Sequence, residues 1–236
     1  MTRQKSNASR PTTPAKGPPI PPAARRGGRP SRTDAAQLGE RILDAATALF
    51  FSSGYGATTI EAVAKRARVS KRTFYHRFDD KAALLRAVVH RTIERMRPPA
   101  DVPLLEGANA EEILRRLAVL ILHAALSAPA IALHRLIVAE SARFPELAGA
   151  VTAQGSANEA IALIAGVLER EAQAGRITLD APVFAARQFL NMVISWPQSR
   201  ALRPGPPMSP AEIDAWAGDV VNLFLNGCRH WASSGR

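Results

Sequence analysis

Cysteine is almost absent from this chain, since Cys228 is the only one among 236 residues. An intramolecular disulfide is therefore excluded, and we expect a cytoplasmic protein whose fold depends on its apolar core. Aromatic residues make up only 6% of the chain, although 47% of it is hydrophobic. Charged residues interrupt every apolar run before it reaches the length of a membrane span, and the N-terminus has no apolar segment. We therefore expect neither a membrane helix nor a secretory signal peptide.

Acidic residues are missing from one end of the chain. Residues 1–33 carry 8 Lys and Arg and no Asp or Glu, residues 34–90 carry 9 basic and 6 acidic residues, and residues 91–236 carry 14 of each. The net charge of +11 therefore belongs wholly to the first 90 residues. This distribution is typical of a protein whose N-terminal end meets a polyanion, although a basic tail that only aids solubility gives the same count.

Sequence runs typical of β-strands are also scarce, while Ala and Leu dominate. We predict an all-α fold of about nine helices. The pattern divides the chain into a basic, Pro-rich, disordered tail (1–33), a small helical domain (34–97) and a larger helical domain (110–233). The tail contains Gly28-Arg29-Pro30, which looks like an AT-hook core; Arg29 and Arg32 could enter an A·T-rich minor groove, attract phosphates without selectivity, or do neither.

Catalytic and metal-binding patterns are lacking as well. None of the 5 histidines is paired at metal-ligand spacing, and no second cysteine is available for a zinc site. The chain has no nucleophile elbow and no Gly-rich phosphate loop. We expect no enzyme activity, no metal and no cofactor.

The most informative stretch runs from residue 57 to residue 85. Thr58-Thr59-Ile60-Glu61 predicts a capping box that begins a short helix, which ends near Arg68. Ser70 can begin a second short helix, with Phe74 and Phe78 turned inward. Its outward residues are Lys71, Arg72, Thr73, Tyr75 and His76. Two short helices with a tight turn and a cationic outer face, over residues 59–78, predict a helix-turn-helix that binds DNA.

Residues 36–94 resemble the DNA-binding domain of TetR-family transcriptional regulators. The resemblance is carried by Gly54-Tyr55, Thr58-Thr59-Ile60, Val63-Ala64, Val69-Ser70-Lys71, Thr73, Tyr75, Phe78, Lys81 and Leu84-Leu85. Arg68 and Arg72 stand where the family usually has Gly. A non-Gly residue with a positive φ at position 68 would cost about 1 kcal/mol.

The resemblance implies that residues 69–76 form a recognition helix in the major groove. The implied DNA contacts are Arg29, Arg32, Thr58, Thr59, Ser70, Lys71, Arg72, Thr73, Tyr75, His76 and Lys81. Helix N-termini at Thr58, Thr59 and Lys81 could hold phosphates. Each residue taken alone could equally be an exposed polar side chain on a solvated surface.

The larger domain is predicted from further helical patterns. They include one long helix from Pro145 to Ala174, a Pro-rich loop from Pro197 to Pro207, and a last helix that begins at Ser209-Pro210-Ala211-Glu212. The segment from Arg135 to Leu147 resembles a block in one subgroup of TetR-family C-terminal domains. The candidate effector pocket comprises Leu117, Ile121, His123, Leu133, His134, Leu136, Ile164 and Val167. These residues could equally form a closed core.

The resemblance also implies a homodimer formed by pairing the last two helices of each subunit. The candidate interface comprises Phe184, Phe189, Val193, Trp196, Trp216, Val220 and Phe224, although ordinary core packing explains the same stripes. Two recognition helices related by a two-fold axis would bind a palindromic operator. We therefore expect a bacterial, DNA-binding, dimeric repressor, nucleoid-associated when bound, that a small apolar effector releases. An activator, or an architectural protein that binds DNA without sequence preference, remains the alternative.

Overall fold

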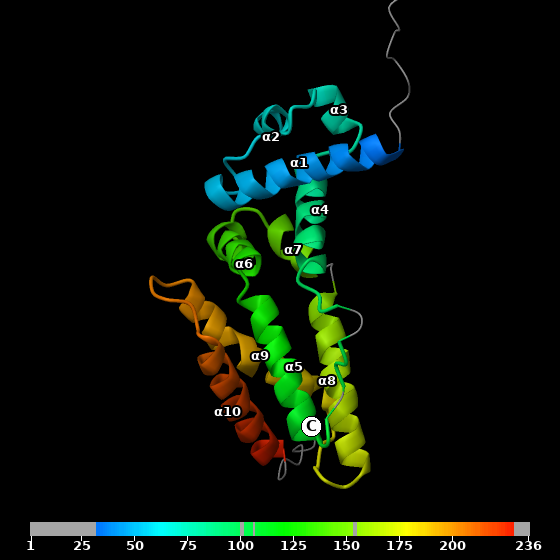
Figure 1. Cartoon of the computed structure of the whole chain (residues 1–236), viewed down its shortest axis with the longest axis vertical. Coiled ribbons are helices and arrows are strands. Elements are labelled where there is room, and N and C mark those ends of the chain that lie inside the picture. Colours follow the sequence, from blue (N-terminus) through cyan, green and yellow to red (C-terminus); the bar gives the residue numbers. More distant parts are fainter. Residues whose placement is uncertain (1–31, 100–101, 106, 153–154, 229–236) are drawn as a thin grey trace, which may run out of the picture.

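The computed structural model describes residues 32–99, 102–105, 107–152 and 155–228, and this part of the chain is entirely helical outside its turns and loops. The helices are α1 (Arg32–Ser53), α2 (Ile60–Ala67), α3 (Lys71–Tyr75), α4 (Lys81–Glu94), α5 (Ala110–Ala125), α6 (Ala128–Glu140), α7 (Glu146–Thr152), α8 (Ser156–Gln173), α9 (Pro182–Ala201) and α10 (Pro210–Cys228). The all-α prediction is confirmed. Figure 1 shows α2 and α3 at one end of an elongated molecule and the α5, α8, α9 and α10 bundle at the other.

Two predicted boundaries differ from the structure. The long helix expected from Pro145 to Ala174 is two helices, because Gly155 adopts a left-handed conformation with φ 68° and α8 begins after it. Pro197 was expected to begin a loop but lies inside α9, where its ring is buried. Burial of the ring compensates for the helical hydrogen bond that proline cannot donate. The division before α8 gives ten helices in the described residues instead of about nine.

Most helix starts follow the sequence signals. Asn109 and Ser127 accept hydrogen bonds from the first-turn amides of α5 and α6. At α10, Ser209 Oγ accepts from the Glu212 amide at 3.2 Å while Glu212 accepts from the Ser209 amide at 2.7 Å, so the predicted capping box is present. Such reciprocal caps satisfy amides that have no partner within the helix.

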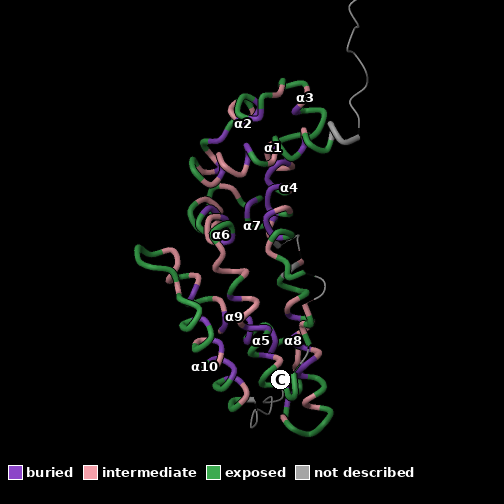
Figure 2. The backbone as a smooth tube through the Cα atoms, in the orientation of Figure 1, coloured by how far each residue is buried: buried purple, intermediate pink, exposed green. Residues whose placement is uncertain are grey.

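Buried residues form two separate hydrophobic cores, which we call the head core and the body core (Figure 2). The head core joins α1–α4 with α6 and α7, and its buried members include Ile42, Phe50, Val63, Phe74, Leu84, Val88, Leu133, Leu136 and Leu147. The body core joins α5, α8, α9 and α10, and its members include Leu114, Leu122, Ile164, Leu168, Phe189, Val193, Ala217 and Val221. Helices α6 and α7 therefore pack with α1 and α4, the helices that flank the helix-turn-helix, although they follow α5 in the chain.

No single helix among the described residues is long and apolar enough to cross a membrane. Helices α5 and α6 satisfy a test of length and composition only as a pair, and they are bent by 69° relative to each other. Their apolar faces pack into different cores, Leu114 and Leu122 into the body core and Leu133 and Leu136 into the head core.

Candidate nucleic-acid interface

The turn between α2 and α3 is built by two caps and one left-handed residue. Thr59 caps α2 by accepting a hydrogen bond from the Ala62 amide at 3.1 Å, and Ser70 caps α3 by accepting one from the Thr73 amide at 3.0 Å. Arg68 ends α2 with φ 55° and ψ 48°, the conformation that the usual Gly adopts without strain. The steric cost of a non-Gly residue with a positive φ therefore applies at this position, where the chain turns from α2 into α3.

The outer surface of α3 is polar and accessible. Lys71, Arg72, Tyr75 and His76 are exposed, while Phe74 is fully buried beneath them in the head core. Tyr75 is 49% exposed, and its ring packs edge-on against Phe74 with centroids 5.5 Å apart. The half-buried Thr73 hydroxyl lies 2.8 Å from Ser70 Oγ. A helix that binds in a DNA groove requires this arrangement, in which one side is packed into the domain and the other exposes cationic and aromatic side chains.

The two cations of α3 differ in their surroundings. Lys71 Nζ forms an ion pair with Glu61 at 2.6 Å. Hydrogen bonding to Lys71 lowers the pKa of Glu61, and the same bond raises the pKa of Lys71. Glu61 was expected to complete the capping box of α2, and its carboxylate also forms the ion pair with Lys71. Arg72 makes no ion pair with any other described residue, so its charge is available to a ligand.

Two residues expected to hold phosphates have partners inside the protein. Thr58 is only 2% exposed, and its hydroxyl donates to the Gly54 carbonyl at 2.7 Å. Lys81 Nζ donates to the carbonyls of Tyr55 at 2.9 Å and Thr58 at 3.2 Å and lies 4.3 Å from the centre of the Tyr55 ring. The Thr58 hydroxyl and the Lys81 ammonium therefore donate to the backbone carbonyls of the turn after α1, which need hydrogen-bond donors.

Of the two DNA contacts predicted in the N-terminal tail, only the backbone of one lies within the described residues. Arg29 lies outside the described residues, and Arg32 is the first residue of α1, with its side chain outside the description. The exposed candidates that remain on the helix-turn-helix are Thr59, Ser70, Lys71, Arg72, Tyr75 and His76, with Thr73 half-buried beside them.

The eight effector-pocket candidates do not come together around one cavity. Leu117, Ile164 and Val167 are buried in the body core, whereas Leu133 and Leu136 are buried in the head core. Ile121 and His134 are half-buried, and His123 is exposed. Apolar periodicity marked the buried faces of these helices correctly, but it does not distinguish a closed core from the wall of a cavity.

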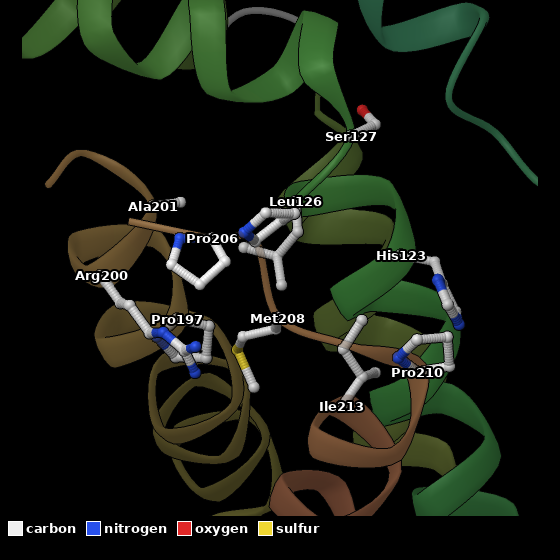
Figure 3. Close-up of a pocket in the computed structure, with 11 residues that line it drawn as sticks. His123, Leu126, Ser127, Pro197, Arg200, Ala201, Pro206, Met208, Pro210 and Ile213 are labelled. Atoms are coloured by element: carbon white, nitrogen blue, oxygen red, sulfur yellow. The ribbon is translucent and has the colours of Figure 1, made fainter. Parts of the chain in front are cut away.

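A pocket of about 290 Å³ lies instead where the end of α5, the end of α9 and the beginning of α10 meet. His123 is the one predicted residue that lines it (Figure 3). The other lining residues are Leu126, Ser127, Pro197, Arg200, Ala201, Pro206, Pro207, Met208, Pro210 and Ile213. Figure 3 places Pro206 and Met208, from the loop between α9 and α10, between the Arg200 side and the Ile213 side. The loop prolines could have suggested this site, since they form a rigid apolar wall.

The interface candidates on α9 and α10 separate into two groups. Phe189, Val193, Val220 and Phe224 are buried within the body core of one subunit. Phe184 and Trp196 are 52% and 50% exposed, and Trp216 is half-buried with its ring stacked on Trp196 at 4.8 Å. The structure adds Val183 and Leu223, which are 53% and 68% exposed. Exposed aromatic and aliphatic side chains gathered on two helices are typical of a protein interface.

No group of three or more His, Cys, Asp or Glu residues in the described ranges is arranged to hold a metal ion.

Comparison with known proteins agrees with this geometry. Residues 42–88 match the family model "Bacterial regulatory proteins, tetR family", and residues 112–227 match "AefR-like transcriptional repressor, C-terminal domain". The HTH-type transcriptional regulator UidR of Escherichia coli K12 is 30% identical over 121 residues, which cover 50% of this chain and 58% of that protein. The matched segment is therefore less than two thirds of that relative's length.

Two solved structures resemble the chain over nearly their whole length. A TetR-family transcriptional regulator from Mesorhizobium loti is 30% identical, with a TM-score of 0.67, covering 81% of this chain and 96% of that one. The flavonoid-responsive regulator FrrA is also 30% identical, with a TM-score of 0.69, covering 84% of this chain and all of that one. With a helix-turn-helix at one end, a larger helical bundle at the other and relatives that span both, the chain belongs to the TetR family of DNA-binding transcriptional regulators.

Proposed function

We propose that this protein is a homodimeric repressor that binds a palindromic operator in the bacterial cytoplasm and leaves it when a small, largely apolar effector binds. The observation that carries the DNA-binding part is the outer surface of α3, where Arg72, Tyr75 and His76 are exposed above the buried Phe74. Arg72 is the foremost candidate for a guanine or phosphate contact, because it has no ion-pair partner among the described residues. Lys71, Thr73, Ser70 and Thr59 would hold the backbone on either side.

The dimer is supported by the apolar surface on α9 and α10. Val183, Phe184, Trp196 and Leu223 together would expose apolar area to water in a monomer. A two-fold pairing of these helices would cover that surface and present two recognition helices to two half-sites. One isolated helix-turn-helix makes few base contacts, so selective binding also favours a pair.

The effector site is proposed at the pocket beside the α9–α10 loop. Its lining is mainly Pro, Met, Leu and Ile, with Arg200 at one side and His123 at the other. Arg200 already pairs with Glu212 at 3.0 Å, so this chemistry suits an apolar ring system that carries hydroxyl groups. FrrA is flavonoid-responsive, and its similarity over its whole length makes flavonoids sensible first probes.

A mobility-shift experiment tests the DNA-binding proposal. An operator would be selected from random duplexes with the full-length protein and then competed against random duplex at physiological salt. We expect Arg72→Ala to weaken operator binding by roughly 5- to 150-fold, the effect of losing a contact worth about 1–3 kcal/mol. Arg170→Ala is the matched control, because Arg170 is exposed on α8, outside both the recognition helix and the proposed dimer interface. Equal binding to operator and random duplex would instead identify an architectural DNA-binding protein.

The effector and the direction of regulation are tested separately. A panel of flavonoids added to the preformed complex should release the operator, and Ala201→Phe, which fills the pocket, should prevent release while binding to DNA persists. Ala162→Phe places the same bulk at an exposed position on α8 and should leave release intact. In vitro transcription from the selected operator should fall when the protein is added; a rise would identify an activator.

A further inference from the structure

The turn after α1 is held by a carboxylate from the far end of α6. Glu140 Oε1 accepts a hydrogen bond from the Tyr55 amide at 2.7 Å, and Glu140 Oε2 accepts one from the Gly56 amide at 2.7 Å. Both oxygens of one carboxylate therefore bind two successive backbone amides, in bonds that are charge-assisted and directional. The donors belong to the turn between α1 and α2, directly before the helix-turn-helix, whereas the acceptor lies 85 residues further along the chain.

Two glycines leave the space that this contact requires. A Cβ at Gly54, where φ is 86°, would collide with Glu140 Oε1. A Cβ at Gly56 would lie 3.0 Å from the Phe144 ring and 3.2 Å from Glu140 Oε2. Both Gly54 and Gly56 therefore let the carboxylate approach the backbone closely, and a larger residue at either position would displace the Glu140 side chain.

The remaining groups of the same turn are also bound. Lys81 donates to the Tyr55 and Thr58 carbonyls, so the amides of the turn face an anion and its carbonyls face a cation. The Tyr55 ring is 2% exposed and packs edge-on against Phe144, with centroids 5.1 Å apart. Burial raises the pKa of the Tyr55 hydroxyl well above its usual value, and the nearby Glu146 carboxylate at the start of α7 raises it further, so the hydroxyl stays protonated.

Helix α6 connects this turn to the pocket. Ser127, which caps α6, lines the pocket beside the α9–α10 loop, and Glu140 is the last residue of the helix. The 13 residues between these ends span about 20 Å, at the rise of 1.5 Å per residue. The other contacts of α6 with the head core, through Leu133 and Leu136, are apolar and therefore less directional than the two hydrogen bonds of Glu140.

We propose that Glu140 is a positioning residue: its carboxylate fixes the orientation of the helix-turn-helix on α6 by holding the Tyr55–Gly56 turn. Glu140 binds the turn that precedes α2, and its influence on operator binding would pass through that turn. The predicted effect on operator binding rests on the proposed function. The role of Glu140 in orienting the helix-turn-helix relative to α6 does not depend on that function.

The test uses Glu140→Gln in the full-length protein. Gln keeps the size of the side chain, but its NH₂ group faces one of the two backbone amides, so one hydrogen bond is replaced by two opposed donors. Spin labels at Arg66→Cys on α2 and Ala162→Cys on α8, in a Cys228→Ser background, report the orientation. Labelled protein is diluted in an excess of unlabelled protein so that only distances within one subunit are measured.

We expect Glu140→Gln to broaden the distance distribution and to weaken binding of the selected operator by roughly tenfold, the effect expected for a lost charge-assisted hydrogen bond. Glu169→Gln, which changes an exposed carboxylate on α8, should alter neither quantity. An unchanged distribution would overturn the proposal, even if Glu140→Gln lowers the melting temperature, because that result describes a stabilising contact only. If the unsubstituted protein selects no operator, the proposed function fails, but the distance measurement still decides the role of Glu140.

Discussion

The head core and the body core present opposite kinds of surface. The head core lies beneath exposed cations, of which Arg72 makes no ion pair with another described residue. The body core lies beneath exposed apolar side chains, of which Leu223 and Trp196 are the clearest examples. A cationic surface favours a polyanion and an apolar surface favours another protein surface. The same chain therefore carries two interfaces of different chemistry, one on each core.

The two cores also divide the chain in an unexpected place. Helices α6 and α7 follow α5, but their buried residues Leu133, Leu136 and Leu147 belong to the head core. The 69° bend between α5 and α6 is therefore a point where the chain passes from one core to the other. Leu126 and Ser127 lie at this bend and line the pocket. A ligand there would contact both the bend and the body helices, so differential binding could shift their relative position.

The largest expected effect comes from truncating one buried aromatic side chain in each core, which tests whether the two cores unfold separately. Phe74→Ala in the head and Phe189→Ala in the body each remove a fully buried ring, and each should cost about 3–5 kcal/mol of the unfolding free energy. The two described tryptophans, Trp196 and Trp216, both lie in the body. In urea, Phe74→Ala should therefore lower the midpoint measured by far-UV circular dichroism more than the midpoint measured by tryptophan fluorescence. Phe189→Ala should lower the fluorescence midpoint directly.

Coincident circular dichroism and fluorescence transitions in both variants would contradict the division, because the two cores would then unfold as one cooperative unit.

A charge on the apolar surface of the body is the next test. Leu223→Glu places a carboxylate at the most exposed large hydrophobic residue of α10, and it should weaken dimerisation by about 2–4 kcal/mol, the range of an interface hot spot. Sedimentation velocity should show monomers, and operator affinity should fall with dimerisation. Ala211→Glu, an exposed position in the first turn of α10, provides the matched control and should remain dimeric. A fully dimeric Leu223→Glu protein would place the interface elsewhere.

The local parts of the head were predictable from sequence. Ser70 and Thr59 have the short oxygen side chains that cap helices, and both cap them. The inward positions of Phe74 and the outward positions of Lys71 and Arg72 follow from helical spacing, and the structure has them so. These features depend on residues within one or two helical turns of each other, which is the range over which periodicity and capping operate.

The parts that depend on distant contacts were not predictable. Glu140 and the Tyr55 amide are 85 residues apart, and nothing in the α6 pattern marks that carboxylate as an acceptor for a turn. Lys81 was expected to hold phosphates because it begins a helix, but the carbonyls that it binds belong to a turn 26 residues earlier. The pocket candidates divide between the two cores for the same reason, since periodicity identifies a buried face but not the helix that covers it.

A smaller effect is expected at the left-handed turn of the head. Arg68→Gly should raise the stability of the head by about 0.5–1 kcal/mol, because Gly adopts a φ of 55° without the steric cost of a Cβ, although it loses more chain entropy on folding. The urea midpoint from circular dichroism should rise slightly, with the tryptophan midpoint unchanged. Arg66→Gly, in the regular part of α2, should lower the same midpoint. A decrease in the stability of Arg68→Gly would mean that the guanidinium makes a compensating contact.

The smallest predicted effect is a mild acid sensitivity confined to the head. Burial lowers the pKa of His134 on α6 from its usual value of 6.5. The unfolded chain therefore binds a proton at this site at a higher pH than the folded chain does. The stability that neutral His134 contributes is complete above pH 6.5 and is lost as the pH falls through the lowered pKa.

The carboxylates of the body core with a lowered pKa, Glu171 and Glu212, titrate from 4.5 downward, so they leave the stability of the body core unaffected in the first part of this pH range. As the pH falls below 6.5, the circular dichroism midpoint in urea should fall relative to the fluorescence midpoint. His134→Gln should abolish that fall, whereas His123→Gln, at an exposed position on α5, should retain it. A fall that persists in His134→Gln would assign the acid sensitivity to another group of the head.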